Sequence, residues 1–408
     1  MFQKKTIKDV PLEGQRVLVR ADYNVPLNKD GTIADDFRIR ASLPTLRYLL
    51  RQNCTIVICS HLGRPEGKPN AAESLEPIAQ ALANLLKKEV SFIPDCIGDR
   101  VKQTIKRLPP RSIVLLENLR FHPGEAANDP GFARQLVEDS GARYFVQDGF
   151  GVVHRANAST EAITQFIPSV AGLLLKKEVT TLAKVRDNPE RPLVAILGGA
   201  KISDKIELVE RFIDSADKVF IGGAMANTFL AWEGWPVGQS LIEPDSFDVV
   251  SRIAAKLHAD EPDRKKQLRT SSKLVLPIDA AVATSIDAQA QRQNRKLEDV
   301  APDDKILDIG DATIEHFVAQ LEGAHTVLWN GTMGMAEYPV FAHGAARIAL
   351  QLATHPEIES VVGGGDTADF VLHWDSNGGK SFHHVSTGGG ASLDFLSGKE
   401  LPGVLALM

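Results

Sequence analysis

The chain has few cysteines, no long hydrophobic run and no excess of positive charge. Its three cysteines show no C-x-x-C spacing, which argues against a disulfide framework or a cysteine-based zinc site. No run of about 18 apolar residues occurs, and the first residues lack the apolar core of a secretory signal. The formal net charge of −6 excludes the global basic field typical of nucleic-acid binding. We therefore expect a cytoplasmic protein with neither nucleic-acid nor membrane partners.

Internal repeats and low-complexity tracts are also missing, so the chain is expected to form ordinary globular domains. Single hydrophobic cores stop growing at roughly 250–300 residues. The chain has 408 residues and 43% hydrophobic residues, enough for more than one large core. Two domains are therefore expected.

Short apolar runs recur along the whole chain, separated by segments with helical periodicity. The runs predict strands at residues 17–19, 56–58, 113–116, 144–146, 193–197, 219–221, 274–276, 327–329, 361–362 and 382–385. Helices are predicted at 75–88, at 246–258 and, near the middle of the chain, at 170–186. This alternation predicts the α/β class, with two doubly wound parallel-sheet (Rossmann-like) domains joined by a helical hinge. A plain surface crossover helix is the alternative for 170–186.

Ligands of open parallel sheets bind beyond the carboxyl ends of the strands. In the first half of the chain, the residues in these places include Arg20, Asp22, Asn24, His61, Arg64, Arg120, His154 and Arg155, with Arg38 a little further on. Arginine presents a planar fork that matches carboxylate and phosphate groups. Five arginines are therefore predicted to form a rim for a small polyanion. For any single arginine, an ion pair with a nearby carboxylate is the alternative.

In the second half, the strands are followed by glycines instead. The clusters are 198–199, 222–223, 331, 363–365 and 388–390. Glycine lets the backbone approach a ligand closely and turn its N–H groups toward phosphate oxygens, above all at a helix N-terminus. One cluster alone would indicate a turn, but their recurrence predicts a nucleotide-binding rim.

Three local patterns carry less weight. Residues 363–368 fit a loose dinucleotide fingerprint, but the following strand offers no acidic residue for a ribose, which disfavours a nicotinamide-dependent dehydrogenase. Residues 379–381 resemble the end of a P-loop, yet they lead into a strand instead of a helix. His383 and His384 are neighbours in a predicted strand, so they face opposite sides and do not favour a metal site.

Eight ordered motifs extend over the whole chain. They are 20–27 (RADYNVPL), 60–65 (SHLGRP), 117–121 (ENLRF), 148–151 (DGFG) with 154–155 (HR), 198–201 (GGAK), 329–331 (WNG), 363–367 (GGGDT) and 386–392 (STGGGAS). In this order they resemble the phosphoglycerate kinase family. The resemblance implies reversible phosphoryl transfer from 1,3-bisphosphoglycerate to ADP, giving 3-phosphoglycerate and ATP with Mg²⁺ as cofactor, by a monomeric glycolytic enzyme.

The resemblance also implies a division of labour along the chain. An N-terminal domain, 1–170, would bind 3-phosphoglycerate, with the tail 393–408 packing back on it. A C-terminal domain, 187–392, would bind the nucleotide, and 171–186 would form the bridging hinge helix. Closure of the two domains is expected to keep water from the acyl phosphate.

Single residues acquire roles in the same way. The substrate-binding positions implied by the resemblance are Asp22, Tyr23, Asn24, Arg38, His61, Leu62, Gly63, Arg64, Arg120 and Arg155. The nucleotide-binding positions are Lys201, Gly310, Asn330, Glu337, Gly364, Gly365, Asp366 and Thr367, with Asp366 also the metal-associated residue. The catalytic positions are Arg38, Lys201, Lys205 (one helical turn beyond Lys201), Gly388, Gly389 and Gly390.

The chemistry fits these residue types, because the attacking ADP oxygen or carboxylate is already ionised and needs no general base. The chain departs from the family at Thr332 and Ala336, where Pro and Phe are common, and at Tyr23 and Gly149, which replace Phe and Ala. No charged catalytic position is lost, so the phosphoryl-transfer chemistry is expected to be kept. The expected consequence is a different fit of the adenine and ribose around Ala336, which would change the nucleotide preference. A non-catalytic nucleotide or sugar-phosphate sensor on the same fold is the alternative function.

Overall fold

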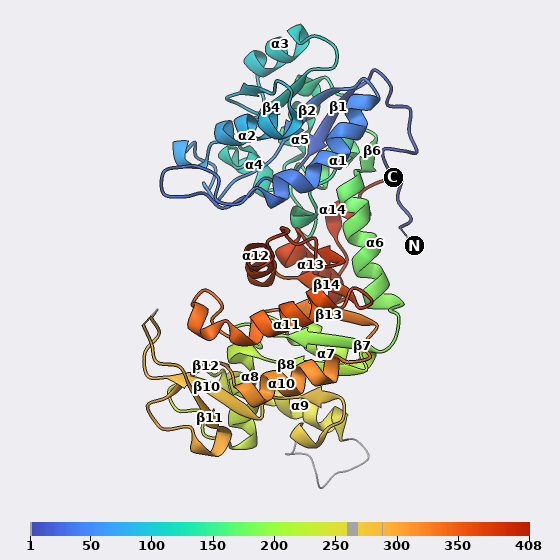
Figure 1. The fold of residues 1–408 in the computed structure, drawn as a ribbon. Helices are drawn as coiled ribbons and strands as arrows, with labels where there is room; N and C mark the ends of the chain where they lie inside the picture. The colour runs from blue at the N-terminus through green and yellow to red at the C-terminus, as the bar shows by residue number, and fades with distance from the viewer. Residues whose placement is uncertain (1, 259–267, 288) are drawn as a thin grey trace. The chain divides into compact units, whose positions relative to one another are not determined.

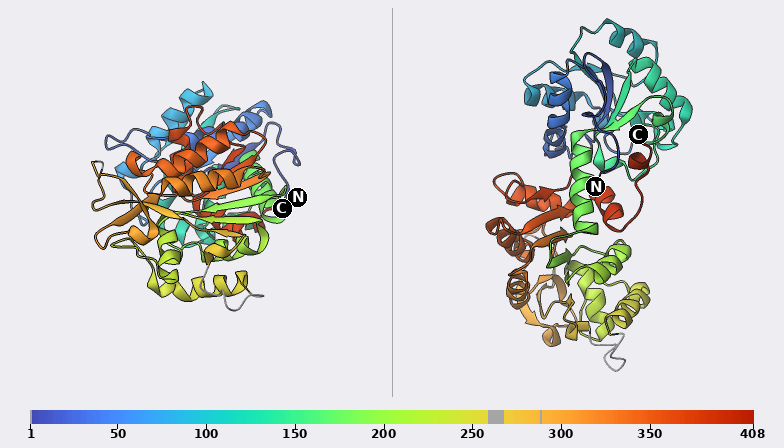
Figure 2. Two further views of the ribbon diagram at one scale, coloured as in Figure 1. Left: turned by 60° about the horizontal axis from the view of Figure 1, so that its bottom comes forward. Right: turned by 90° about the vertical axis from the view of Figure 1, so that its right-hand side faces the viewer.

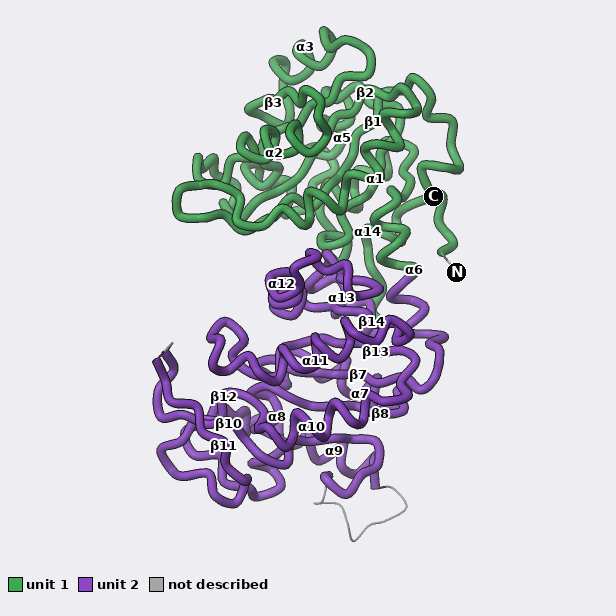
Figure 3. The backbone as a smooth tube through the Cα atoms, viewed as in Figure 1, with its two compact units in different colours: residues 1–180, 398–408 green, residues 181–397 purple. Residues whose placement is uncertain are grey.

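The chain divides into two compact units. The computed structural model describes residues 2–258, 268–287 and 289–408. Unit 1 comprises Met1–Thr180 and Gly398–Met408, and unit 2 comprises Thr181–Ser397 (Figure 3). Within the described ranges, no helix is long and apolar enough to cross a membrane. Unit 1 is thus assembled from both ends of the sequence.

Unit 1 is built around a parallel sheet with strand order β3-β4-β2-β1-β5-β6 (Figure 1). Its strands are β1 (Arg16–Arg20), β2 (Thr55–Cys59), β3 (Ser91–Ile93), β4 (Ile113–Leu116), β5 (Tyr144–Gln147) and β6 (Ser169–Ala171). Its helices are α1 (Phe37–Arg51), α2 (Glu76–Leu86), α3 (Asp99–Arg107), α4 (Pro123–Ala126), α5 (Pro130–Ser140) and α14 (Pro402–Leu405).

Both faces of this sheet are buried. Val17 and Val19 of β1 belong to the core cluster that α1 and α2 complete, whereas Leu18 belongs to the cluster on the other face, with α3 and α5. In the right-hand view of Figure 2, the blue helix α1 and the teal helix α5 lie on opposite sides of the sheet. A sheet covered on both faces needs continuous apolar strands, which explains the runs seen in the sequence.

The C-terminal segment is an integral part of unit 1. The backbone N–H of Lys5 donates to the carbonyl of Met408 over 2.7 Å, and that of Gly403 donates to the carbonyl of Val153 over 2.9 Å. Leu401 and Leu407 are buried. The two chain ends therefore lie together, as Figure 1 also shows.

Unit 2 contains a parallel sheet with strand order β15-β14-β13-β7-β8-β9 and a small antiparallel sheet with order β11-β10-β12. Its strands are β7 (Leu193–Leu197), β8 (Lys218–Ile221), β9 (Leu274–Val275), β10 (Asp279–Ala283), β11 (Gln293–Lys296), β12 (Lys305–Ile309), β13 (Thr326–Asn330), β14 (Glu359–Gly363) and β15 (His384–Val385). Its helices are α7 (Ile206–Ser215), α8 (Gly223–Glu233), α9 (Phe247–Leu257), α10 (Asp311–Leu321), α11 (His343–Thr354), α12 (Gly365–Trp374) and α13 (Gly389–Leu396). Helix α6 (Leu173–Asp187) begins in unit 1 and ends in unit 2.

The predicted fold class is confirmed, with corrections at particular elements. The helix predicted at 170–186 starts three residues later, because Ser169–Ala171 pairs with β5 as strand β6. Gly172 separates strand from helix, and a β-carbon there would overlap the side chain of Asp148. Strands β3, β6, β10, β11 and β12 were not predicted. The antiparallel sheet is an addition to the two doubly wound domains.

Candidate active site

Residues after β1 and β2 form a hydrogen-bonded cluster in unit 1. Arg38, in the first turn of α1, donates from Nη1 to Asp22 Oδ2 over 3.1 Å and to the carbonyl of Asn24 over 3.0 Å. The side-chain oxygen of Asn24 accepts from the backbone N–H of Gly63 over 2.9 Å. Four predicted substrate residues, Asp22, Asn24, Arg38 and Gly63, are thus brought together by direct contacts.

Arg120 joins the cluster from the loop after β4. Its Nη1 donates to the carbonyl of Gly63 over 2.6 Å. Burial, with Arg20 and Arg155 nearby, lowers the pKa of Arg120 to about 10. A guanidinium whose charge is disfavoured by its surroundings is stabilised when an anion binds beside it. The crowding of positive charge therefore favours a negatively charged ligand here.

Arg20 corrects the sequence-based interpretation, which placed it at the ligand rim. Its side chain is 1% exposed and points into unit 1. Its Nε donates to Ser159 Oγ over 2.8 Å, and its Nη2 lies 3.2 Å from His61 Nδ1 and 3.8 Å from Glu125 Oε1. Glu125 also accepts from the hydroxyl of Ser159 over 2.6 Å. Arg20 is a buried support for the rim and not part of it.

His61 is held in one protonation state by these contacts. Because arginine only donates, Nδ1 of His61 must accept from Arg20, which leaves the proton of the neutral ring on Nε2. Burial, together with Arg20 and Arg120, moves the pKa of His61 well below its usual range. The ring is 3% exposed, and no hydrogen bond joins Nε2 to another described residue. The ring is thus largely buried, and its Nε2–H is a donor that none of the described residues uses.

The remaining predicted residues of unit 1 differ in accessibility. Arg64 and Arg155 are exposed, and Arg155 contributes to the lowered pKa of His61. Tyr23 is fully buried in the core, where its hydroxyl lies 3.0 Å from Ser42 Oγ. Leu62 is also buried. The side chains of Tyr23 and Leu62 therefore pack in the core and are not open to a substrate.

In unit 2, Lys205 lies between the ends of β7 and β13. Its ammonium group donates to the carbonyls of Gly198 over 2.7 Å and Asn330 over 2.9 Å. Burial lowers its pKa to about 8, and Asp366 opposes this shift. Lys201 is exposed. The prediction that Lys205 lies one helical turn beyond Lys201 is wrong, because residues 202–205 form a turn and α7 begins at Ile206.

Two helix N-termini lie close together beside this lysine. Gly364 precedes α12, and Gly388 precedes α13. A β-carbon on Gly389 would lie 3.9 Å from the backbone nitrogen of Gly365. The first N–H groups of a helix lack partners within it, and the helix dipole favours negative charge there. Paired N-termini of this kind form an anion-binding site made of backbone.

Asn330 and Thr367 connect β13 to the start of α12. The hydroxyl of Thr367 accepts from the backbone N–H of Gly331 over 2.6 Å. The amide of Asn330 lies against Gly364 and is 1% exposed, and its Nδ2 donates to no described residue. A buried donor without a partner is costly unless a ligand or water occupies it.

Several glycines of unit 2 serve packing instead of ligand approach. A β-carbon on Gly198 or Gly331 would lie less than 3 Å from backbone atoms of the facing loop. One on Gly222 would overlap the sulfur of Met333. By contrast, nothing lies within 4 Å of a β-carbon on Gly365. The glycine-rich rim therefore combines close loop packing with an open helix N-terminus.

A pocket of about 770 Å³ lies between α11 and α12. Its lining includes Glu337 and Asp366, two predicted nucleotide residues, and Thr332 and Ala336, two of the four departures from the family. Gly310 lies elsewhere, before α10, where the carboxylate of Asp279 leaves no room for a β-carbon. None of the described contacts connects Gly310 with the cluster at Lys205.

Sequence reasoning missed Glu125 and Ser159. Both support Arg20 from distant parts of the chain, and Ser159 lies 139 positions beyond it. Neither follows a predicted strand or belongs to a motif used above. Only the tertiary structure shows that Glu125 and Ser159 form a second layer of residues, which supports Arg20 behind the predicted site.

Two doubly wound α/β units with anion-binding groups beyond their strands define a protein that binds small anionic ligands. A family model described as phosphoglycerate kinase matches residues 7–399. A phosphoglycerate kinase of Chloroflexus aurantiacus is 45% identical over 100% of this chain and 99% of its own length. That of Moorella thermoacetica is 45% identical over 99% of both chains.

Solved structures agree with these relatives. Phosphoglycerate kinase from Coxiella burnetii matches with a TM-score of 0.83 and 35% identity, covering 99% of this chain and 98% of that one. The chain belongs to the phosphoglycerate kinase family. It is a phosphotransferase with a carboxyl group as acceptor, and the predicted glycolytic reaction between 1,3-bisphosphoglycerate and ADP is confirmed. Nothing in the comparisons favours the sensor alternative.

Proposed function

We propose that unit 1 binds 3-phosphoglycerate or 1,3-bisphosphoglycerate and that unit 2 binds ADP or ATP. The observation that carries this division is that each unit holds its own anion-binding cluster. In unit 1 the cluster consists of charged side chains, and in unit 2 it consists of two helix N-termini with Lys205.

In unit 1, Asp22 and Asn24 bind the glycerate portion, and the basic side chains bind its phosphate. The Nε2–H of His61 and the guanidinium groups of Arg64, Arg120 and Arg155 supply the donors. Arg38 faces the transferring phosphoryl group, whose charge spreads over its equatorial oxygens in the transition state. Support for this role comes from its place in the first turn of α1, half-buried beside Asp22.

In unit 2, the N–H groups at Gly364 and Gly365 and at Gly388–Gly390 bind phosphate oxygens. Lys201 and Lys205 add positive charge beside them, and Asn330 contributes its unpaired donor. Glu337 binds the ribose, and Thr367 fixes the loop after β13 to α12. The nucleotide-binding role of Gly310 remains a prediction, as does any effect of Thr332 and Ala336 on nucleotide preference.

Magnesium fits the nucleotide side of this site. Mg²⁺ prefers oxygen ligands and is commonly held by one or two carboxylates together with substrate phosphates. Asp366 is exposed in the first turn of α12, and no group of three potential metal-ligating His, Cys, Asp or Glu side chains exists among the described residues. Asp366 would therefore hold the ion jointly with the nucleotide. When bound, the ion neutralises charge on the phosphate oxygens.

The reaction requires the two ligands to meet, while each unit would hold only one of them. Helix α6 joins the units in the chain, and its role as a hinge is part of this proposal. The partners are small molecules, and a monomeric state is proposed with them.

A coupled assay tests the proposal. Purified protein is mixed with 3-phosphoglycerate, ATP and Mg²⁺, and a glyceraldehyde-phosphate dehydrogenase consumes the acyl phosphate, so that loss of NADH reports turnover. Arg38→Ala is expected to lower kcat by about 10²–10³-fold, as expected for loss of a transition-state donor. Arg40→Ala is the matched control, because Arg40 lies on the same helix but forms an exposed ion pair with Asp36. Equal rates in the two variants would contradict the role of Arg38.

A further inference from the structure

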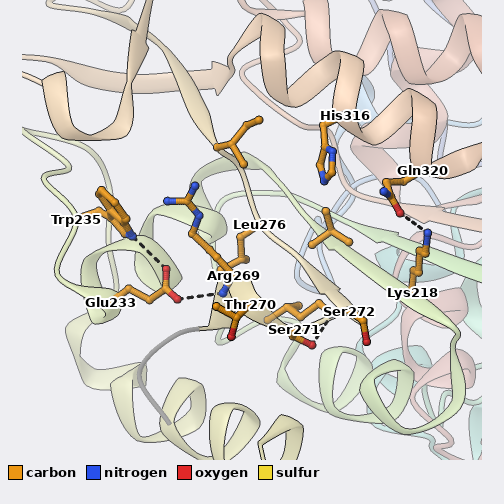
Figure 4. A pocket seen from close by; sticks show the side chains of 13 residues that line it. Lys218, Glu233, Trp235, Arg269, Thr270, Ser271, Ser272, Leu276, His316 and Gln320 are labelled. Atoms are coloured by element: carbon orange, nitrogen blue, oxygen red, sulfur yellow. Dashed lines mark hydrogen bonds between the residues drawn. The ribbon is translucent and has the colours of Figure 1, made fainter. Parts of the chain in front are cut away.

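Unit 2 contains a second pocket, of about 900 Å³, away from the proposed nucleotide site (Figure 4). Lys218 and Leu274, the first residues of β8 and β9, both line it. Glu233, the last residue of α8, lines it as well. The proposed nucleotide residues follow the carboxyl ends of β7, β13 and β14. The lining also includes Leu276 and Ile278, which follow β9, so this pocket lies along the edge strand of the sheet and shares no described residue with those strand ends.

One side of the pocket presents an oriented guanidinium group. The Arg269 guanidinium carbon lies 4.8 Å from the centre of the Trp235 ring, a distance typical of cation–π stacking. Its side-chain N–H groups donate to no residue in the described part of the chain, although its backbone N–H donates to Glu233. The Trp235 ring thus positions a cation whose side-chain donors are not used by any residue that the structure describes.

The other side of the pocket presents polar groups from β8 and α10. Lys218 donates to the side-chain oxygen of Gln320, and Figure 4 shows His316 above this pair. His316 and Gln320 are four residues apart on α10, so they share one face of the helix. Arg269 and Lys218 therefore line the same pocket from different elements.

Among the lining residues that the structure describes, basic side chains outnumber acidic ones. Arg269 and Lys218 bring a guanidinium and an ammonium group, and the one acidic side chain of this described set is that of Glu233. That carboxylate already accepts from the indole Nε1–H of Trp235 over 3.1 Å and from the backbone N–H of Arg269 over 3.2 Å. It is therefore used to position the stacked pair, and it pairs with neither cationic head group through any described contact.

The floor of the pocket is apolar. Leu274, Val275, Leu276 and Ile278 contribute to it. Ile278 is 39% exposed, unusually open for a residue of its size and hydrophobicity. Small-molecule pockets typically combine such an apolar surface with a few convergent polar groups, in volumes of roughly 300–1,000 Å³.

We propose that this pocket binds a small organic anion, such as an aryl sulfonate or carboxylate, with its charged group between Arg269 and Lys218 and its apolar body on Leu276 and Ile278. The site is independent of the proposed catalytic roles. None of its lining residues belongs to the proposed substrate or nucleotide clusters.

Fluorescence titration with anilinonaphthalene sulfonate tests this proposal. We expect one saturable site on the full chain that excess ADP with Mg²⁺ does not displace. Naphthalene sulfonate is expected to compete, whereas uncharged naphthol and inorganic sulfate, each lacking one half of the recognised chemistry, compete at least about tenfold more weakly.

Arg269→Glu and Lys218→Glu should each weaken dye binding by about tenfold or more while turnover stays at the parental level, which shows that the variants are folded. Arg252→Glu is the matched control, since Arg252 lies exposed on α9 and outside the pocket. Trp235→Phe should reduce the quenching of tryptophan fluorescence by the dye. Parental dye affinity in both pocket variants, or displacement of the dye by ADP, would overturn the proposal.

Discussion

Units 1 and 2 share a parallel-sheet architecture, but their anion sites consist of different chemical groups. Unit 1 uses side chains: Arg38 contacts Asp22 and Asn24, and Arg120 and Arg38 lie close enough to His61 to lower its pKa. Unit 2 uses mainly backbone, with the N-termini of α12 and α13 beside one buried lysine. A side-chain site gathers full charges that repel each other, whereas a backbone site offers partial charges that are fixed by the fold.

The difference has a structural consequence in each unit. The charges of unit 1 need a second layer, in which Glu125 and Ser159 hold Arg20 and Arg20 orients His61. The backbone of unit 2 needs glycines that let facing loops approach, as at Gly198 and Gly331. The comparison predicts that the two sites fail through different changes.

The largest contrast is expected on removal of the C-terminal tail. Deletion of residues 401–408 removes Leu401 and Leu407, both 3% exposed, from unit 1. Loss of a buried leucine costs about 2–5 kcal/mol, so two losses approach the stability of a whole domain. Turnover and 3-phosphoglycerate binding should therefore collapse, while calorimetry should show ADP affinity within about twofold of the parent. Leu405→Ala, at an exposed position, is the control, and equal losses for both ligands would count against the account.

A smaller effect is expected from Ser159→Ala, which removes the hydroxyl that accepts a hydrogen bond from Arg20 Nε and donates one to Glu125 Oε1. Loss of one buried hydrogen-bond partner costs about 1–3 kcal/mol, and denaturant unfolding should show this decrease. The ¹⁵N resonances of His61 should show a mixture of tautomers instead of the Nε2–H form alone. Ser112→Ala, in an exposed turn, should change neither property. If His61 kept the Nε2–H form alone in Ser159→Ala, the contacts of Ser159 would not orient the His61 ring.

The smallest expected effect concerns a proton in unit 2. The pKa of Lys205 is about 8, so close to half of these lysines are neutral at pH 8. A bound ADP phosphate favours the charged form and raises this pKa, so binding at pH 8 should take up about half a proton. Calorimetry in buffers of different ionisation enthalpy measures this uptake. The proton uptake should vanish in Lys205→Met. It should persist in Lys201→Met, because the Lys201 side chain is exposed in the parent protein. Unchanged uptake in Lys205→Met would assign the proton to another group.

The sequence was informative where one physical pattern dominates. Strands buried on both faces, such as Leu193–Leu197, are continuous apolar runs and were predicted correctly. Strand β11 reads Gln-Asn-Arg-Lys and is mostly exposed, so it carries no hydrophobic signal, and its sheet was missed. Strand β6 was absorbed into a helix prediction because Val170 and Ala171 also fit helical periodicity.

The sequence likewise predicted part of the site in unit 1 and misplaced another part. Position after a strand identified Asp22 and Arg38 as neighbours of one cluster, and the structure joins them directly. The same rule misplaced Arg20, because the last residue of a strand can point either to the rim or into the core. Burial decides between these outcomes, and burial of Arg20 depends on Glu125 and Ser159, which local sequence does not connect with it.

The central claim, that each unit binds one substrate, is tested most directly by calorimetric titration of two variants with two ligands. Arg120→Ala should weaken 3-phosphoglycerate binding by roughly tenfold to a hundredfold, the value of a charged hydrogen bond, and leave ADP binding with Mg²⁺ unchanged. Asp366→Asn should weaken ADP binding in the presence of Mg²⁺ and leave 3-phosphoglycerate binding unchanged. Equal weakening of both ligands in either variant, or the reverse pattern, would contradict the assignment of one substrate to each unit.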